Sequence, residues 1–181
     1  MSASAVERYH WDRETYKRAV EAGVFGDADV LLRHGAVVAR VSPQGSRHAW
    51  AIQVLNDCFA SRDRTRYGLR VQNPIGRTDD DEPEPDLAVV TAKRYVDDHP
   101  GPQDVHLVIE VCDTSYRSDL EKVREYAEVG IPLVWIVDVG HQQVEVFTDP
   151  DPAGRAYRGH VVRTDGELAF DGVRVTIADL F

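Results

Sequence analysis

Apolar and polar positions alternate along the chain with two periods, and each period predicts one kind of element. Residues 12–23 (DRETYKRAVEAG) have the spacing of an amphipathic helix that stops at Gly23. The run 29–41 (DVLLRHGAVVARV) predicts a hairpin that turns at His34-Gly35. A second helix is predicted over 47–61, where apolar residues recur at helical spacing. The expected buried faces of the two helices are Tyr16, Ala19 and Val20, and Ala51, Val54, Leu55, Cys58 and Phe59.

The rest of the chain predicts strands. An extended segment over 68–75 (GLRVQNPI) precedes an acidic turn, TDDDEPEPD, and short apolar runs follow at 87–90, 104–111, 133–139 and 143–147. Near-continuous apolar strands indicate a sheet covered on both faces and at least partly parallel. A helix with a capping box at Ser118–Glu121 and a stop at Gly130 lies between two of them, so strand, helix and strand form a crossover unit. The tail predicts one more hairpin. The fold class is therefore α/β (α+β), with a mixed central sheet flanked by helices.

Length and composition limit the choice of protein class. The 181 residues suit one domain over 12–181, preceded by a tail over 1–11, and 43% hydrophobic residues can form a sizeable core. No apolar run approaches the ~20 residues that span a bilayer, and the polar N-terminus does not resemble a signal peptide. Cys58 and Cys112 form no disulfide or metal pattern, so we expect a reduced, cytoplasmic protein.

The net charge of −10 argues against a protein held to nucleic acid by phosphate contacts alone, which needs at least a basic patch. One local candidate for such contacts is the arginine cluster SRDRTRYGLR, with Arg62, Arg64, Arg66 and Arg70. The alternative is that these arginines form only a solvated helix end and loop.

One carboxylate, Glu110, lies within an apolar strand, where an unpaired charge is costly. It is close to the carboxyl end of its strand, and the following helix begins at the same edge of the sheet. Asp119, Lys122 and Tyr126 share one face of that helix, so Lys122 can reach back over Glu110. Asp86 follows Pro85 and opens the strand at 87–90; if that strand neighbours the Glu110 strand, the two carboxylates converge.

Two carboxylates and a lysine at one sheet edge suit Mg²⁺, which binds one or two carboxylates together with substrate phosphate oxygens. The lysine can position water or stabilise charge on the phosphate. The alternative is a structural cluster, in which Glu110 and Lys122 form a partly buried salt bridge and Asp86 is a turn residue.

Five segments in order resemble the Uma-type family of restriction-endonuclease-like proteins, within the PD-(D/E)XK nuclease superfamily. They are SPQGSRHAWAIQVL, EPEPDLAVV, HLVIEVCDTSYRSDLEK, YAEVGIPLVWIVD and VRVTIADLF, and the resemblance extends from about Asp12 to Phe181. It implies a restriction-endonuclease-like core with a divalent metal at its carboxylate edge. The superfamily's acidic residues match Asp86, after Pro85, and Glu110. Its usual lysine position is occupied by Cys112, whereas in the Uma-type family the lysine lies on the next helix, which matches Lys122.

Three supporting assignments follow with open alternatives. Glu84 could assist the metal or belong to an exposed acidic loop. His48 could point at the site from the start of its helix or be a satisfied core histidine. Asp119 could orient Lys122 or only favour the helix N-terminus by its charge.

The favoured function is a Mg²⁺- or Mn²⁺-dependent endonuclease acting on nucleic acid, with DNA preferred. Homodimerisation is expected by analogy, because duplex cleavage requires two sites. The main alternative is a catalytically silent binding or assembly module with the nuclease fold, which the acidic charge favours. A metal-dependent hydrolase of small phosphate esters is a third hypothesis, and neutralising the arginine cluster distinguishes it from a nuclease.

Overall fold

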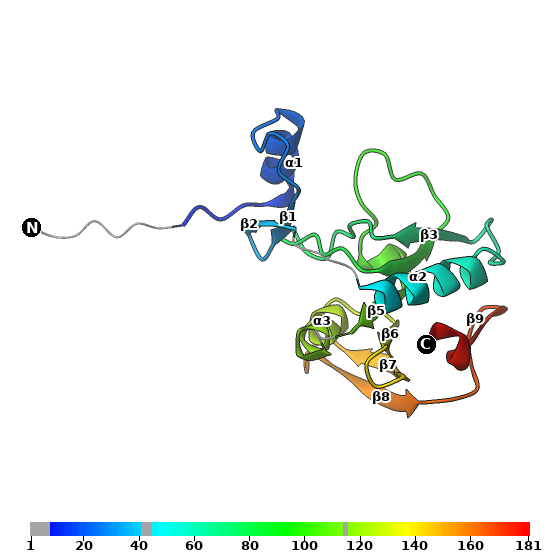
Figure 1. Cartoon of the computed structure of the whole chain (residues 1–181). Helices are drawn as coiled ribbons and strands as arrows, with labels where there is room; N and C mark the ends of the chain where they lie inside the picture. Colours follow the sequence, from blue (N-terminus) through cyan, green and yellow to red (C-terminus); the bar gives the residue numbers. More distant parts are fainter. Residues whose placement is uncertain (1–7, 41–44, 114–115) are drawn as a thin grey trace, which may run out of the picture.

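The structure is a computed structural model that describes residues 8–40, 45–113 and 116–181, without the side chains of residues 116–119. Its centre is a six-stranded sheet of order β3-β4-β5-β6-β7-β8 (Figure 1). The neighbours β5 and β6 are parallel and the other pairs are antiparallel, which confirms the predicted mixed sheet. The strands are β3 (Tyr67–Val71), β4 (Leu87–Thr91), β5 (Val105–Cys112), β6 (Leu133–Asp138), β7 (Gln143–Asp151) and β8 (Ala156–Arg163).

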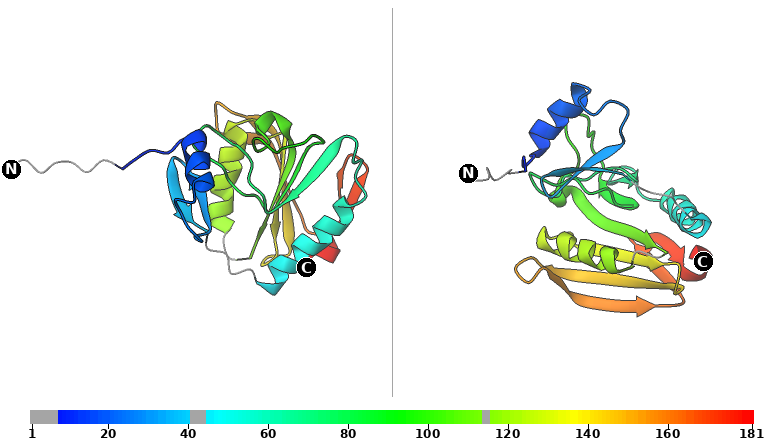
Figure 2. Two further views of the ribbon diagram at one scale, coloured as in Figure 1. Left: turned by 90° about the horizontal axis from the view of Figure 1, so that it is seen from above. Right: turned by 60° about the vertical axis from the view of Figure 1, so that its left-hand side comes forward.

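Each face of the sheet is covered (Figure 2). Helix α3 (Tyr116–Glu128) packs on one face. On the other face lie α2 (Ser46–Phe59), the hairpin β9 (Glu167–Phe170)–β10 (Val173–Thr176) and the 3₁₀ turn η2 (Ile177–Leu180). Side chains alternate across a strand, so Ile109 of β5 joins the α2 core while Val108 joins the α3 core. Two covered faces explain why the strands are apolar at successive positions.

The N-terminal elements form a separate unit beside the sheet. Helix α1 (Arg13–Glu21) is capped by Asp12, whose side chain accepts a hydrogen bond from the Thr15 backbone amide, 2.7 Å away. The hairpin of β1 (Val30–Arg33) and β2 (Ala36–Ala39) turns at the predicted pair, with positive φ at both residues. Its Leu32 carbonyl accepts from the Glu82 amide at 2.9 Å, which places the hairpin beside the segment that leads into β4.

Two local predictions were wrong. Val20 is 49% exposed, because α1 lies at the outside of the molecule and buries only Tyr16 and Ala19 (Figure 1). Helix α3 begins at Tyr116, so Ser118 lies within its first turn and does not precede the helix. The predicted C-terminal hairpin is confirmed as β9–β10, and the residues before it form β8, which pairs with β7 at the edge of the sheet.

The stop of α3 is confirmed, since Gly130 follows it with φ +75°. The extent of the domain, over 12–181, stays a prediction. Among the helices that the structure describes, none has the length and apolar character needed to cross a membrane.

Candidate active site

Asp86 and Glu110 meet at one edge of the sheet. Strands β4 and β5 are antiparallel, and the pairing of Leu87 with Ile109 places Asp86 opposite Glu110. Asp86 Oδ2 accepts a hydrogen bond from the Val111 amide at 2.8 Å, so its carboxylate leans across onto β5. The predicted neighbour relation of the two strands is therefore confirmed, and it brings both carboxylates to the same place.

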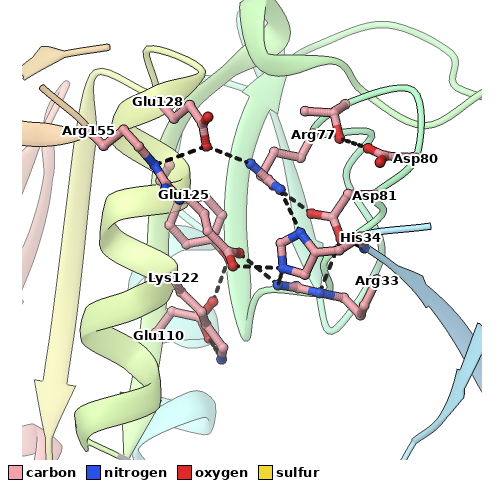
Figure 3. A network of polar contacts seen from close by, with 12 residues as sticks. Arg33, His34, Arg77, Asp80, Asp81, Glu110, Lys122, Glu125, Glu128 and Arg155 are labelled. Carbon is pink, nitrogen blue, oxygen red and sulfur yellow. Dashed lines mark hydrogen bonds and ion pairs between the residues drawn. The ribbon is translucent and has the colours of Figure 1, made fainter. Parts of the chain in front are cut away.

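Glu110 is 2% exposed and is held by two side chains of α3 (Figure 3). The Lys122 ammonium donates to its Oε2 at 2.9 Å, and the Tyr126 hydroxyl donates to its Oε1 at 2.6 Å. Lys122 and Tyr126 are four residues apart, so they lie on one face of the helix. Burial, with the charge of Glu110, raises the pKa of the Tyr126 phenol well above its ordinary value. An ammonium and a phenol thus compensate the buried carboxylate.

His48 points at the site from the first turn of α2. Its Nε2 lies 3.2 Å from Asp86 Oδ2. This hydrogen bond raises the pKa of the His48 imidazole above its ordinary value, against the lowering effect of burial, and the charges of Asp86 and Glu110 add to the rise. Its Nδ1 is buried and has no hydrogen-bond partner among the residues that the structure describes, which does not match a satisfied core histidine.

Gln72 is a site residue that the sequence interpretation missed. It follows β3 directly, opposite Asp86, and its backbone N–H donates to the Asp86 backbone carbonyl at 2.9 Å. Its Nε2 lies 3.4 Å from Asp86 Oδ1, and its φ of +49° is in the left-handed region. The useful signal was the pairing of the two strands, because the residue opposite Asp86 becomes identifiable once β3 is paired with β4.

Glu84 is held by an arginine that directly follows β2. Its carboxylate pairs with Arg40 at 2.9 Å, and its side chain is only 12% exposed, so the exposed-loop interpretation was wrong. Burial raises the pKa of the Glu84 carboxyl. The side chain of Asp119 lies outside the described residues, and its role stays a prediction.

Two of the four arginines of the cluster are partly buried. Arg62 donates to the backbone carbonyls of Phe59 and Tyr67, each at 3.0 Å, and so closes the end of α2. Arg70 lies 3.4 Å from the Nδ1 atom of His99. Burial lowers the pKa of both guanidinium groups. These two side chains have structural partners within the fold.

The other two arginines lie at the surface. Arg66 pairs with Asp171 at 2.7 Å and also stacks over the Tyr67 ring. Arg64 is exposed. The four arginines therefore divide between structural and surface positions and do not act as one uniform basic patch.

The donor set fits a hard cation with few protein ligands. Within the described part of the chain, no group of three or more histidine, cysteine, aspartate and glutamate side chains is arranged to hold a metal ion. Asp86 and Glu110 offer two carboxylates, and Mg²⁺ is commonly bound by one or two carboxylates plus waters and substrate phosphate oxygens. The site thus suits Mg²⁺ or Mn²⁺ together with a phosphate substrate.

Comparisons with known proteins identify a fold neighbour and a family. A crystal structure described as "a putative nuclease belonging to DUF820 from Anabaena variabilis ATCC 29413" has a similar fold, with a TM-score of 0.60 at 17% identity over 84% of this chain and 89% of that chain. No curated protein matches the sequence. The model of the Uma2 family, described as "Putative restriction endonuclease", matches residues 22–178. The chain therefore belongs to the Uma2 family of restriction-endonuclease-like proteins.

Proposed function

We propose that this protein is a Mg²⁺- or Mn²⁺-dependent endonuclease that hydrolyses phosphodiester bonds in nucleic acid, with DNA as its substrate. The observation that carries the proposal is the placement of Asp86 opposite Glu110, with the Lys122 ammonium 2.9 Å from the second carboxylate. Its family and fold neighbour are both described as nucleases, which supports the same reaction class.

Asp86 and Glu110 are the residues that would hold the ion. When bound, such an ion supplies a water of lowered pKa and neutralises charge at the phosphorus. Lys122 has three donor protons, so it can donate to Glu110 and to a phosphate oxygen on which charge develops. Tyr126 fixes one oxygen of Glu110, and His48 fixes one oxygen of Asp86. These contacts orient the carboxylates before a substrate arrives.

The net charge of −10 implies that binding to a polynucleotide is weak and salt-sensitive unless additional contacts are made. A homodimer supplies such contacts and a second active site for duplex cleavage, and we include it in the proposal. Exposed Arg64 and Arg66 remain the proposed phosphate contacts of the arginine cluster. A cytoplasmic location remains the prediction from the sequence, in which Cys58 and Cys112 form no disulfide or metal pattern.

One observation favours the alternative, a silent binding or assembly module. Each carboxylate has a cationic or basic partner within the protein, since Lys122 pairs with Glu110 and His48 contacts Asp86. A cluster satisfied in this way can serve stability alone.

Calorimetric titration of Mn²⁺ distinguishes the two. We expect the wild type to bind Mn²⁺ and Glu110→Gln to lose that binding. Glu145→Gln is the matched control, because Glu145 on β7 is also a strand carboxylate that is 2% exposed, and it is hydrogen-bonded to His160 on β8 at 2.6 Å. It should bind Mn²⁺ like the wild type.

Cleavage of double- and single-stranded DNA and of RNA follows with the same three proteins. Metal-dependent cleavage by the wild type and Glu145→Gln, but not by Glu110→Gln, supports the proposal. Equal Mn²⁺ binding by all three proteins, or none by any, refutes a metal site at Glu110 and favours the silent module.

A further inference from the structure

A second group of charged side chains joins the β1–β2 hairpin to helix α3 (Figure 3). Its members are Arg33, His34, Arg77, Asp81 and Glu125. Asp81 is completely buried, and Glu125 and Arg77 are 5% and 6% exposed. Buried charges are costly unless they are paired, so this group specifies one docked position of the hairpin against the helix.

Arg33 connects two carboxylates that are far apart in the sequence. Its Nε lies 3.2 Å from Asp81 Oδ1, and its Nη2 lies 2.7 Å from Glu125 Oε2. The other oxygen of Asp81 pairs with Arg77 Nε at 2.5 Å. The segment before β4 and helix α3 are therefore joined through one guanidinium group of the hairpin.

His34 engages the second oxygen of Glu125. Its Nε2 lies 2.9 Å from Glu125 Oε1, and its Nδ1 lies 3.3 Å from Arg77 Nη2. A guanidinium only donates, so Nδ1 accepts and Nε2 carries the proton that is donated to Glu125. The backbone amide of His34 also donates to Asp81 Oδ1 at 3.0 Å, and its φ of +49° fixes the turn.

This group is connected through the chain both to Asp86 and to the α3 residues of the candidate site. Asp81 precedes Asp86 by five residues, while Glu125 follows Lys122 by three and directly precedes Tyr126. We propose that Glu125, held by Arg33 and His34, is a positioning residue that keeps Lys122 against Glu110. The consequence of this positioning for cleavage rests on the proposed function, but the effect of Glu125 on the placement of Lys122 does not.

The chain has only three lysines, Lys17, Lys93 and Lys122, so acylation of each by an N-hydroxysuccinimide ester can be followed by mass spectrometry. Lys93, which follows β4, pairs with Asp104 at 2.9 Å and serves as the internal reference. Glu125→Gln keeps the shape of the side chain but loses its charge. In this variant we expect the acylation rate of Lys122, relative to that of Lys93, to rise about five-fold, which is the factor that corresponds to the loss of about 1 kcal/mol of contact energy.

Glu121→Gln is the matched control. Glu121 is the exposed neighbour of Lys122 and pairs with Arg124 at 3.0 Å, so this variant removes one charge close to the same lysine without touching the hairpin. Its Lys122 rate should stay near that of the wild type. An unchanged Lys122 rate in Glu125→Gln, or an equal rise in Glu121→Gln, overturns the proposal. A parallel rise at Lys93, which indicates general loosening, also overturns it.

If Glu125→Gln does not fold, His34→Asn provides the same test. Asparagine tolerates the left-handed backbone of the turn but removes the ring contacts to Glu125 and Arg77. The same selective rise at Lys122 is expected, and its absence overturns the proposal.

Cleavage kinetics distinguish a positioning role of Glu125 from a purely structural role. We expect Glu125→Gln to keep the Mn²⁺ affinity of the wild type, and to lower kcat about ten-fold at unchanged KM, because the lost contact acts in the transition state. A fall in Mn²⁺ affinity with unchanged kcat overturns positioning of Lys122. If the wild type neither binds Mn²⁺ nor cleaves, the proposed function fails, and the acylation rates alone decide the role of Glu125.

Discussion

Replacing Tyr126 by phenylalanine removes one hydroxyl from the buried end of the site and leaves the ring in place. The hydroxyl donates to Glu110 over 2.6 Å, and neither side chain is more than 2% exposed. A hydrogen bond to a charged group contributes about 1.5–3 kcal/mol. We therefore expect Tyr126→Phe to lower the free energy of unfolding at pH 8 by about 2 kcal/mol, and Tm by about 4–8 °C for a chain of this size.

The loss of unfolding free energy caused by Tyr126→Phe should be smaller at alkaline pH. The pKa of Tyr126 is raised well above its ordinary value in the folded protein, whereas the unfolded phenol ionises near pH 10. The stability that this raised pKa contributes is fully present below pH 10 and is lost as the pH rises further, because the unfolded state releases a proton that the folded state keeps. At pH 11 this loss is about 1.4 kcal/mol in the wild type and zero in the variant, so the deficit should fall to about 0.6 kcal/mol.

Urea denaturation at pH 8 and pH 11, followed by the fluorescence of the buried Trp135, measures both values. Tyr157→Phe is the matched control, since the Tyr157 hydroxyl donates to the neutral Ile131 carbonyl at 2.7 Å. It should cost about 1 kcal/mol at pH 8. A deficit for Tyr126→Phe no larger than that of the control refutes the contribution of the Glu110 charge. A deficit equal at both pH values refutes the raised pKa.

Three further predictions concern other parts of the site. In the metal-free protein, NMR titration should give His48 a pKa above 6.5. The stability contributed by this raised pKa is then present below pH 6.5 and is lost as the pH rises through the pKa of the folded protein. Asp86→Asn should lower the His48 pKa, and a wild-type pKa at or below 6.5 contradicts the hydrogen bond between the two side chains. Mn²⁺ at about 100 times its Kd should add about 2.7 kcal/mol to the free energy of unfolding in thermal denaturation, and Glu110→Gln should show no such gain. Arg62→Ala should cost about 1 kcal/mol in urea denaturation, because it removes two hydrogen bonds from the guanidinium group to backbone carbonyls. Arg64→Ala should stay within about 0.5 kcal/mol of the wild type but reduce the salt slope of nucleic-acid binding by about 1, and equal stability losses contradict this division.

The strands and the two carboxylates could be predicted because local pattern determines them. An eight-residue apolar run has few stable placements other than a buried strand, and a carboxylate near its end must lie at the edge of the sheet. The spacing of Lys122 and Tyr126 also predicts that the two residues share one helix face. Where periodicity and connection length decide the outcome, the sequence is sufficient.

Partner choice between distant segments could not be predicted. The acidic turn TDDDEPEPD is typical of a solvent-exposed loop, yet Asp81 within it is completely buried. It pairs with Arg77, which directly precedes the turn, and with Arg33, which comes from the distant β1–β2 hairpin. Glu125 is one of several charged residues on its helix and is distinguished only by the hairpin that packs against it. No period or spacing encodes these contacts, because they depend on the docking of the N-terminal unit.

The position of the lysine follows from the same docking. Cys112, two residues after Glu110, points to the same face of β5 and is 1% exposed within the core beneath α3. The helix covers that position, and a residue of the helix itself, Lys122, supplies the cation to Glu110. A lysine on the strand is fixed by the sheet, whereas a lysine on the helix is only as well placed as the helix. The hairpin contacts of Glu125 therefore supply a constraint that a strand-borne lysine does not need.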